Sequence, residues 1–176
     1  RILGGFLEKN TIQFVSHTID TITGFAGVYH GIISNPDKNF SIKGKIIGDT
    51  TMDFGYPNIS YTGKQECDNE SFISFNHTSP SDYSGFSGVY YSNNMNYSEI
   101  VKMKEGDSIV NILSGTYERW GDYSGSQRKF NEPGKIWVAG SYGNSQLKNA
   151  TWVAEIQSPD SNIMSIAISE MKDASM

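Results

Sequence analysis

The sequence is poor in cysteine, in charge and in long apolar runs, and each shortage excludes a class of protein. Its one cysteine, Cys67, cannot close a disulfide within the chain, so a small fold held together by disulfides is excluded. No apolar stretch approaches the roughly 18 residues that a membrane-spanning helix needs. Charged residues make up only 19% of the chain, a share that disfavours long solvated helices.

Positive charge is also scarce. The 14 Lys and Arg residues are outnumbered by 19 Asp and Glu, which gives a net charge of -5 and predicts no nucleic-acid partner. The sequence opens on Arg1-Ile2-Leu3, without an initiator Met or the charged start of a signal peptide, so we expect a processed or excerpted chain. Its 176 residues suffice for one core or for a slice of a larger array.

Glycine and aromatic residues are plentiful, and they occur in segments that repeat. Gly24-Phe25-Ala26-Gly27-Val28-Tyr29 recurs 61 residues later as Gly85-Phe86-Ser87-Gly88-Val89-Tyr90. Residues 12–18 match 73–78 with one residue deleted, 42–50 match 100–108, and a weaker third copy spans 136–140, 151–154 and 163–169. The pattern indicates three similar units.

Each unit contains several short runs rich in β-branched and aromatic residues, separated by Gly, Asn, Asp, Ser and Pro. In the second unit these runs are 58–62, 72–78, 88–92 and 99–104. We therefore predict an all-β fold of about three four-stranded antiparallel blades of a β-propeller, within one domain, 1–176. The approximate blades are 1–50, 51–110 and 111–176, and the tail 162–176 is expected to add a strand rather than a helix.

The first blade is predicted to be incomplete. Counted back from Ile59 by one 61-residue period, its innermost strand would begin before Arg1. Three blades cannot close a ring that typically needs four to eight. The predicted partners are therefore the remaining blades, from the same chain or from another.

The segment Arg119-Trp120-Gly121-Asp122-Tyr123-Ser124, followed by a turn at Pro133 and a strand around Trp137, resembles a motif in secreted and cell-surface β-propeller proteins of Bacteroidetes. Residues 24–31, 54–59 and 88–91 look similar to the same group. The resemblance implies an extracellular or cell-surface protein, exported by the type IX route and associated with adhesion or gliding. It implies no defined activity.

Loops at one end of a propeller form its usual binding surface. The predicted ligand-binding residues are Asp122, Arg128, Arg119, Tyr123 and Trp120. Asp122 is expected on an innermost strand, where it binds a cation, pairs with Arg119 or Arg128, or accepts backbone N–H bonds. Gly121 would let the backbone approach closely. The tryptophans either stack on sugars or pack between sheets.

Other reactive side chains point to no catalytic, metal or cofactor site. His17 and His77 share a repeat position and are expected to make the same local hydrogen bond. Cys67 lies between acidic residues that oppose thiolate formation. The six Asn-x-Ser/Thr triplets are either glycan acceptors or a polar surface; they begin at Asn39, Asn58, Asn69, Asn76, Asn96 and Asn149.

The sequence thus predicts a noncatalytic propeller segment that serves as a scaffold or as a module recognising protein or glycan. One alternative is a fragment of a sialidase-like glycosidase. Such an enzyme needs three converging arginines, and Arg1, Arg119 and Arg128 are poorly placed for that. The other alternative is a freestanding β-sandwich that binds carbohydrate.

Overall fold

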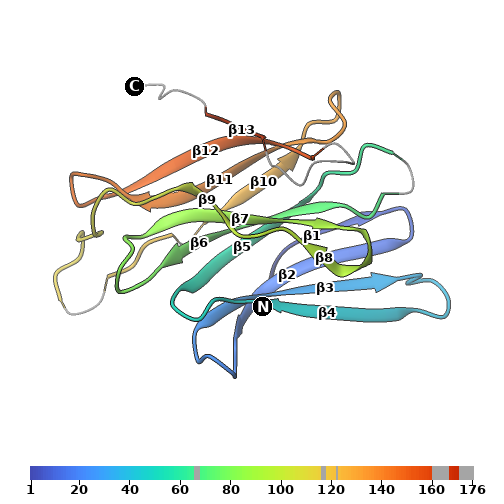
Figure 1. Ribbon diagram of the computed structural model, residues 1–176, viewed down its shortest axis with the longest axis horizontal. Helices are drawn as coiled ribbons and strands as arrows, with labels where there is room; N and C mark the ends of the chain where they lie inside the picture. Colours follow the sequence, from blue (N-terminus) through green and yellow to red (C-terminus); the bar gives the residue numbers. More distant parts are fainter. Residues whose placement is uncertain (66–67, 116–117, 122, 160–166, 171–176) are drawn as a thin grey trace.

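The computed structural model consists of three antiparallel β-sheets that follow one another along the chain (Figure 1). It describes residues 1–65, 68–115, 118–121, 123–159 and, for the backbone, 167–170. In the first and third sheets the spatial order of the strands is their order in the sequence, and in the second sheet the last two short strands both pair with the third. Every pair of neighbours is antiparallel, which short hairpin connections allow.

The strands have the following bounds. The first sheet contains β1 (Ile2–Glu8), β2 (Thr11–Ile19), β3 (Ala26–Ser34) and β4 (Ser41–Ile47). The second contains β5 (Asp53–Tyr61), β6 (Ser71–Thr78) and β7 (Gly85–Ser92), with the short β8 (Asn96–Tyr97) and β9 (Val101–Lys104) both paired to β7. A single 3-10 turn, Asn93–Met95, precedes β8. The third contains β10 (Gly125–Arg128), β11 (Lys135–Gly143), β12 (Asn149–Gln157) and β13 (Ala167–Glu170).

The predicted all-β class and the three antiparallel sheets are confirmed. The described residues form no α-helix, and none of their helical segments has the length and apolarity to cross a membrane. A fold of three sheets also argues against the β-sandwich alternative, which needs two.

The prediction of an incomplete first blade is wrong, because β1 gives the first sheet all four of its strands. The prediction failed because the loop between the first two strands is much shorter in the first sheet than in the second. Only Lys9 and Asn10 separate β1 from β2, whereas residues 62–70 separate β5 from β6. A fixed period counted back from β5 therefore overshoots the chain's first strand.

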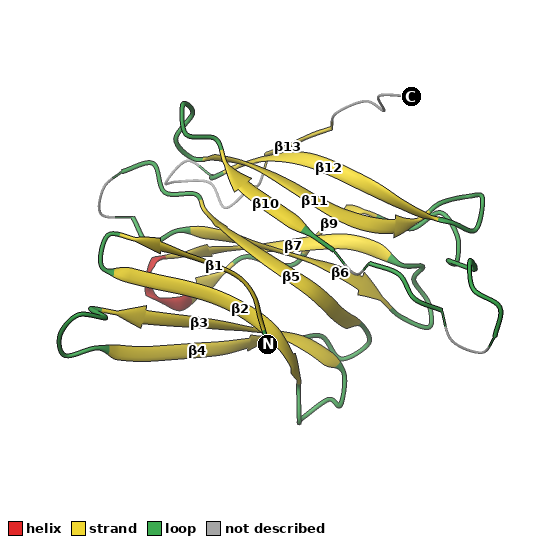
Figure 2. Ribbon diagram, turned by 180° about the vertical axis from the view of Figure 1, so that it is seen from behind, coloured by secondary structure: helices red, strands yellow, loops and turns green. Residues whose placement is uncertain are grey.

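The second sheet lies between the other two and is buried on both faces, as Figure 2 shows from behind. The interface between the first and second sheets contains a core of eight buried side chains, contributed by both sheets: Val15, Val28, Ile47, Phe54, Ile59, Ile73, Phe75 and Val89. The interface between the second and third sheets contains a second core of eight buried side chains, again from both sheets: Phe72, Phe86, Tyr90, Met103, Ile136, Val138, Ala154 and Ile156. Burial of each such side chain stabilises the fold by roughly 1.5–3 kcal/mol.

The sequence repeat is only partly reproduced in space. Val15 faces the second sheet, so its neighbour Phe14 faces away from the second sheet. Phe75 likewise faces away from the sheet that follows its own, the third. Phe14 and Phe75 therefore occupy equivalent positions. Val28 and Val89 are not equivalent, because Val28 faces the following sheet and Val89 the preceding one. A match between segments of sequence does not fix which face a strand buries.

The first strands of the three sheets lie side by side. β5 contacts β1 on one side and β10 on the other. The sheets therefore converge along β1, β5 and β10, with their later strands further apart (Figure 1).

Candidate functional site

Two adjoining hollows open where the three first strands begin. The larger has a volume of about 470 Å³ and is lined by Arg1, Leu3, His17, Tyr56, Pro57, Asn58, Arg119, Tyr123 and Ser124. The second, of about 330 Å³, shares His17, Tyr56 and Arg119 and extends to Asp53, Glu118 and Trp120. Together they are called the convergence cleft below. All three sheets or the loops that enter them contribute to its walls.

The centre of the convergence cleft is a strained backbone position. Tyr56 has a φ of 51°, in the left-handed region, and the pairing of β5 with β6 shifts between Gly55 and Asn58. Such a conformation costs about 1–3 kcal/mol outside glycine and persists only when neighbours hold it. His17 Nε2 accepts a hydrogen bond from the Tyr56 amide at 3.3 Å, and Ser124 Oγ donates to the Tyr56 carbonyl at 2.6 Å. The first sheet and the loop before the third thus hold Tyr56 in place.

His17 is neutral in this arrangement. Partial burial lowers the pKa of its imidazole. Because Nε2 accepts the amide hydrogen bond, Nδ1 carries the proton. The Tyr56 ring meets the His17 ring edge-on, with centroids 5.2 Å apart.

Side-chain hydrogen bonds fasten β10 to β5 below the cleft. Asn58 Nδ2 donates to the Ser124 carbonyl at 3.3 Å, and its Oδ1 accepts from Ser126 Oγ at 2.9 Å. Ser60 and Ser126 share a further bond of 2.8 Å. These bonds fix the chain immediately after Tyr123 relative to the second sheet.

Asn76 holds the other side of the same loop, a role that no sequence pattern indicates. Its side chain, 1% exposed, donates to the Gly121 carbonyl at 3.0 Å and accepts from the Ser141 amide at 3.1 Å. Gly121 has a φ of 71°, and a Cβ there would lie 2.5 Å from Asn76 Nδ2. The expectation that Gly121 permits a close backbone approach is confirmed.

Three of the predicted ligand-binding residues come together. Arg119 lines both hollows, Tyr123 lines the larger and is 88% exposed, and Trp120 lines the smaller. All three precede β10, which begins at Gly125. The expectation that Asp122 lies on an innermost strand is untested. Asp122 itself lies outside the described residues.

Arg128 is not part of the cleft. It ends β10, where its guanidinium pairs with Glu8 at 2.9 Å and lies 4.9 Å from the Tyr61 ring centre. Glu8 and Tyr61 end β1 and β5, so Arg128 clamps the far ends of the three first strands. At about 3.3 Å per residue, a four-residue strand is long enough to separate Arg128 from Tyr123.

The arginines a sialidase would need do not converge. Arg1 and Arg119 line the same hollow, contrary to the sequence expectation, but Arg128 lies at the opposite end of the first strands. Two carboxylates, Asp53 and Glu118, line the smaller hollow, and both accept backbone hydrogen bonds: Asp53 from Ala26, and Glu118 from Ile112 and Leu113.

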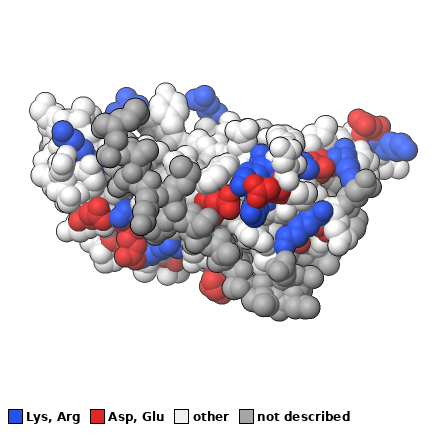
Figure 3. All heavy atoms as spheres, turned by 90° about the horizontal axis from the view of Figure 1, so that it is seen from above, with Lys and Arg blue, Asp and Glu red and all other residues white. Residues whose placement is uncertain are grey.

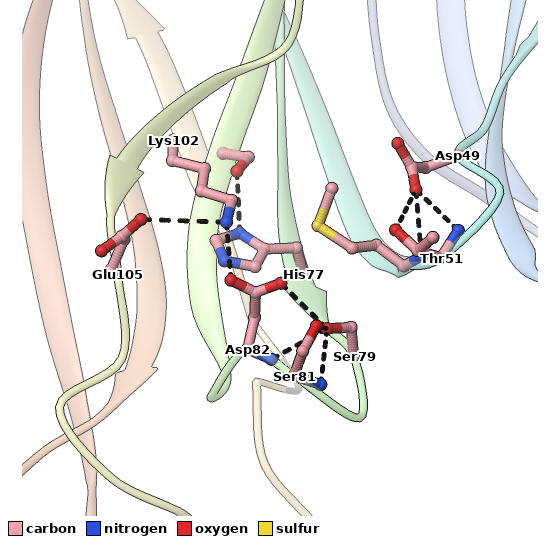
Figure 4. A network of polar contacts seen from close by, with 10 residues as sticks. Asp49, Thr51, His77, Ser79, Ser81, Asp82, Lys102 and Glu105 are labelled. Atoms are coloured by element: carbon pink, nitrogen blue, oxygen red, sulfur yellow. Dashed lines mark hydrogen bonds and ion pairs between the residues drawn. The ribbon is translucent and has the colours of Figure 1, made fainter.

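His77 is a second candidate for acid–base chemistry, and its surroundings oppose that role. Its Nδ1 shares a 2.7 Å hydrogen bond with Ser87 Oγ, but His77 and Ser87 are each 1% exposed. Burial lowers the pKa of His77 to about 4. Figure 4 shows the nearby Lys102 directed at Asp82 and Glu105, which pair with it at 2.6 and 3.8 Å. A Ser–His pair sealed from solvent cannot reach a substrate.

The expected equivalence of His17 and His77 is wrong. His17 faces the following sheet, the second, and accepts a hydrogen bond from the Tyr56 amide. His77 faces the preceding sheet, the first, because it lies on the same face of β6 as Phe75. The one-residue deletion that aligned their sequences falls inside β2, which pairs with β3 without a bulge, so it reverses the face.

A buried polar network lies further along the interface between the first two sheets. His30 Nδ1 lies 2.7 Å from Tyr97 Oη and its Nε2 lies 3.1 Å from Gln13 Oε1, which also accepts from Ser71 Oγ at 2.8 Å. Burial lowers the pKa of His30 to about 4. Both nitrogens have partners as a neutral imidazole: Nδ1 accepts and Nε2 donates.

Acidic and basic side chains lie beside one another on the molecular face seen in Figure 3. On the third sheet, Lys129 pairs with Glu132 and Glu155, and Lys135 pairs with Glu132. In the described part of the chain, no three His, Cys, Asp or Glu side chains gather as metal ligands would. Cys67 lies outside the described residues.

The Asn-x-Ser/Thr triplets differ in accessibility. Asn58 and Asn76 use their side chains in the hydrogen bonds given above, which leaves neither available as a glycan acceptor. Asn39, Asn69, Asn96 and Asn149 are exposed.

No family model, curated protein or solved structure matches this chain. The resemblance to Bacteroidetes propellers therefore stays a prediction.

Proposed function

We propose that this chain forms three successive blades of a β-propeller and acts as a noncatalytic recognition module outside the cell, binding a glycan in the convergence cleft. The single observation that carries the binding role is the cleft's position and content: it opens where the first strands of all three sheets converge, and side chains from each sheet fix its walls.

The propeller arrangement is supported by the order of the strands. Each sheet runs outward strand by strand from β1, β5 or β10, and these three strands contact one another in sequence. Propeller blades have this order, with the first strand at the central axis.

The cleft offers groups that suit a sugar. Tyr123 exposes 88% of its surface, and an aromatic ring stacks on the C–H face of a pyranose. Arg119 lies beside it and supplies a planar set of donors, and His17 presents its Nδ1–H. The hydrogen bonds that hold Tyr56 and Asn58 preorganise the surface, which reduces the ordering cost of binding.

Binding rather than hydrolysis is favoured because both carboxylates of the smaller hollow accept backbone N–H bonds, Asp53 through one oxygen and Glu118 through both. A glycosidase instead needs one carboxyl group that is free to protonate the leaving oxygen.

The test is a screen of the purified chain against immobilised neutral and acidic glycans, followed by calorimetry with the soluble form of each hit. Tyr123→Ala is expected to weaken binding by roughly 3- to 10-fold, the loss of one stacked ring. Phe130→Ala is the matched control, since Phe130 is 74% exposed but packs by Arg128, away from the cleft. Equal loss in both variants, or no glycan bound by the wild type, contradicts the proposal. Turnover of chromogenic glycosides would favour the sialidase-like alternative.

A further inference from the structure

The outer face of the first sheet is an apolar surface that nothing in the described chain covers. It consists of Leu7, Ile12, Phe14, Tyr29, Ile42 and Ile46, which alternate with the residues facing the second sheet. Leu7, Ile42 and Ile46 are 63%, 59% and 40% exposed. The residues of β2, β3 and β4 on this side carry no charge. Soluble monomers rarely expose an apolar patch of more than a few hundred Å².

On this face, aromatic rings lie over glycines of the neighbouring strand, as they do on a sheet face that is packed inside the chain. The Phe14 ring lies over Gly31 and the Tyr29 ring over Gly44, where an added Cβ would overlap them. Inside the stack, the Phe72 ring lies over Gly88 in the same manner, and there a neighbouring sheet covers it.

The two interfaces within the chain show which kind of face covers such a surface. At the second interface, the later sheet presents mainly apolar side chains, such as Ile136, while the earlier sheet adds polar groups, such as Asn76. At the first interface both sheets add polar groups, since Gln13 of the earlier sheet bonds Ser71 of the later one. The open face of the first sheet therefore resembles the later side of the second interface, which is mainly apolar.

The outer face of the third sheet corresponds to the earlier side of such an interface, which combines apolar and polar side chains. Trp137, Ala139 and Val153 form its apolar centre, on the side opposite Ile136 and Val138. Lys129 lies 5.1 Å from the Trp137 ring centre and pairs with Glu155. Val153 is 37% exposed.

We propose that a second copy of this chain covers the first sheet, head to tail, with the outer face of its third sheet. The same contact made twice joins two copies into a closed ring of six sheets, within the four to eight that propellers use. The inference rests on the propeller arrangement proposed above. It places the convergence clefts of both copies around one axis.

The test is the mass of the 176-residue chain, measured by light scattering during size exclusion and by analytical ultracentrifugation between about 1 and 100 μM. The expected particle has twice the 19.5 kDa mass of one chain. Ile46→Lys places a charge on the apolar face of β4, within the proposed interface, and is expected to weaken association at least 100-fold, as is Val153→Lys on the opposite face.

Ile22→Lys is the matched control, because Ile22 is 93% exposed in the loop between β2 and β3 and off both faces; it should stay a dimer. Thermal melting checks that each variant folds, and Ile42→Lys replaces Ile46→Lys if the latter does not.

A wild-type chain that remains a single copy overturns the proposal, as does a dimer that persists in Ile46→Lys. Loss of association in Ile46→Lys but not in Val153→Lys would mean that two first sheets pack on each other, which also overturns it. Growth beyond two copies excludes the closed ring. Glycan binding by the single-copy Ile46→Lys variant tests the cleft separately, so failure of the assembly is distinguishable from failure of the proposed function.

Discussion

Acid is expected to destabilise this protein through its buried histidines, and His30 provides the sharpest test. As a neutral ring, His30 bonds Tyr97 and Gln13 between the first and second sheets. Protonation would place a second N–H where Nδ1 now accepts the tyrosine hydroxyl, and would put a charge in a site that is 0% exposed. The pKa of His30 is accordingly about 4 in the folded protein, against 6.5 for an ordinary histidine.

The direction and size of the effect follow from this difference in pKa. Between pH 6.5 and 4 the unfolded chain binds more protons than the folded one, so stability is full above pH 6.5 and falls as the pH drops toward 4. From pH 7 to pH 5, one such histidine removes about 2 kcal/mol of unfolding free energy. His77, whose pKa is also about 4, contributes a similar amount, so the wild type should lose about 4 kcal/mol.

The assay is urea unfolding followed by tryptophan fluorescence at several pH values from 7 to 5. His30→Gln keeps a neutral polar group in the network and should halve the loss on acidification, whatever its stability at pH 7. His17→Gln is the control, since His17 is exposed, and should leave most of the pH dependence intact. A His30→Gln variant with the full wild-type dependence between pH 7 and 5 would refute the reasoning.

Two further substitutions test the packing of the third sheet and the anchoring of the cleft. Gly140→Ala would place a methyl group into the Phe86 ring and should cost about 1–3 kcal/mol, seen in thermal melting as a drop of several degrees. Gly125→Ala, where no atom lies within 4 Å of the added Cβ, should change stability by less than about 0.5 kcal/mol; equal effects of the two alanines would contradict the packing argument. Asn76→Ala removes the side-chain bonds to Gly121 and Ser141 and should destabilise the fold by about 2–4 kcal/mol while weakening glycan binding, whereas Asn39→Ala, at an exposed position, should do neither. An Asn76→Ala protein with wild-type stability in urea would show that the loop before β10 is held by other contacts.

Much of the fold could be predicted from the sequence because strand formation depends on local pattern. The run at 72–78 became β6 with nearly the same bounds, and the run at 88–92 became the second half of β7, since β-branched and aromatic residues between Gly, Asn and Ser favour short strands whatever they later contact. The number of sheets followed from the repeat. The first strand was missed because β1 contains two glycines and few β-branched residues, and because a loop length set its distance from β2.

The candidate site could be predicted only in part. Arg119, Trp120 and Tyr123 adjoin in sequence, so any fold that exposes that loop brings them together. Arg128 is separated from them by one extended strand, which places it at the far end of the first strands beside Glu8. Asn76 and His17 belong to the site through contacts with loops far away in the sequence, and no local pattern marks them.

Local patterns are sufficient to specify short antiparallel strands in three sheets, because backbone preference and hydrogen bonding between consecutive strands are local. Which face of each strand is buried depends instead on how the sheets pack against one another. One bulge at Tyr56 or one residue deleted within a strand reverses every side chain beyond it, and packing against a neighbouring sheet selects the outcome. For the same reason the open apolar face of the first sheet became visible only when the sheets were stacked.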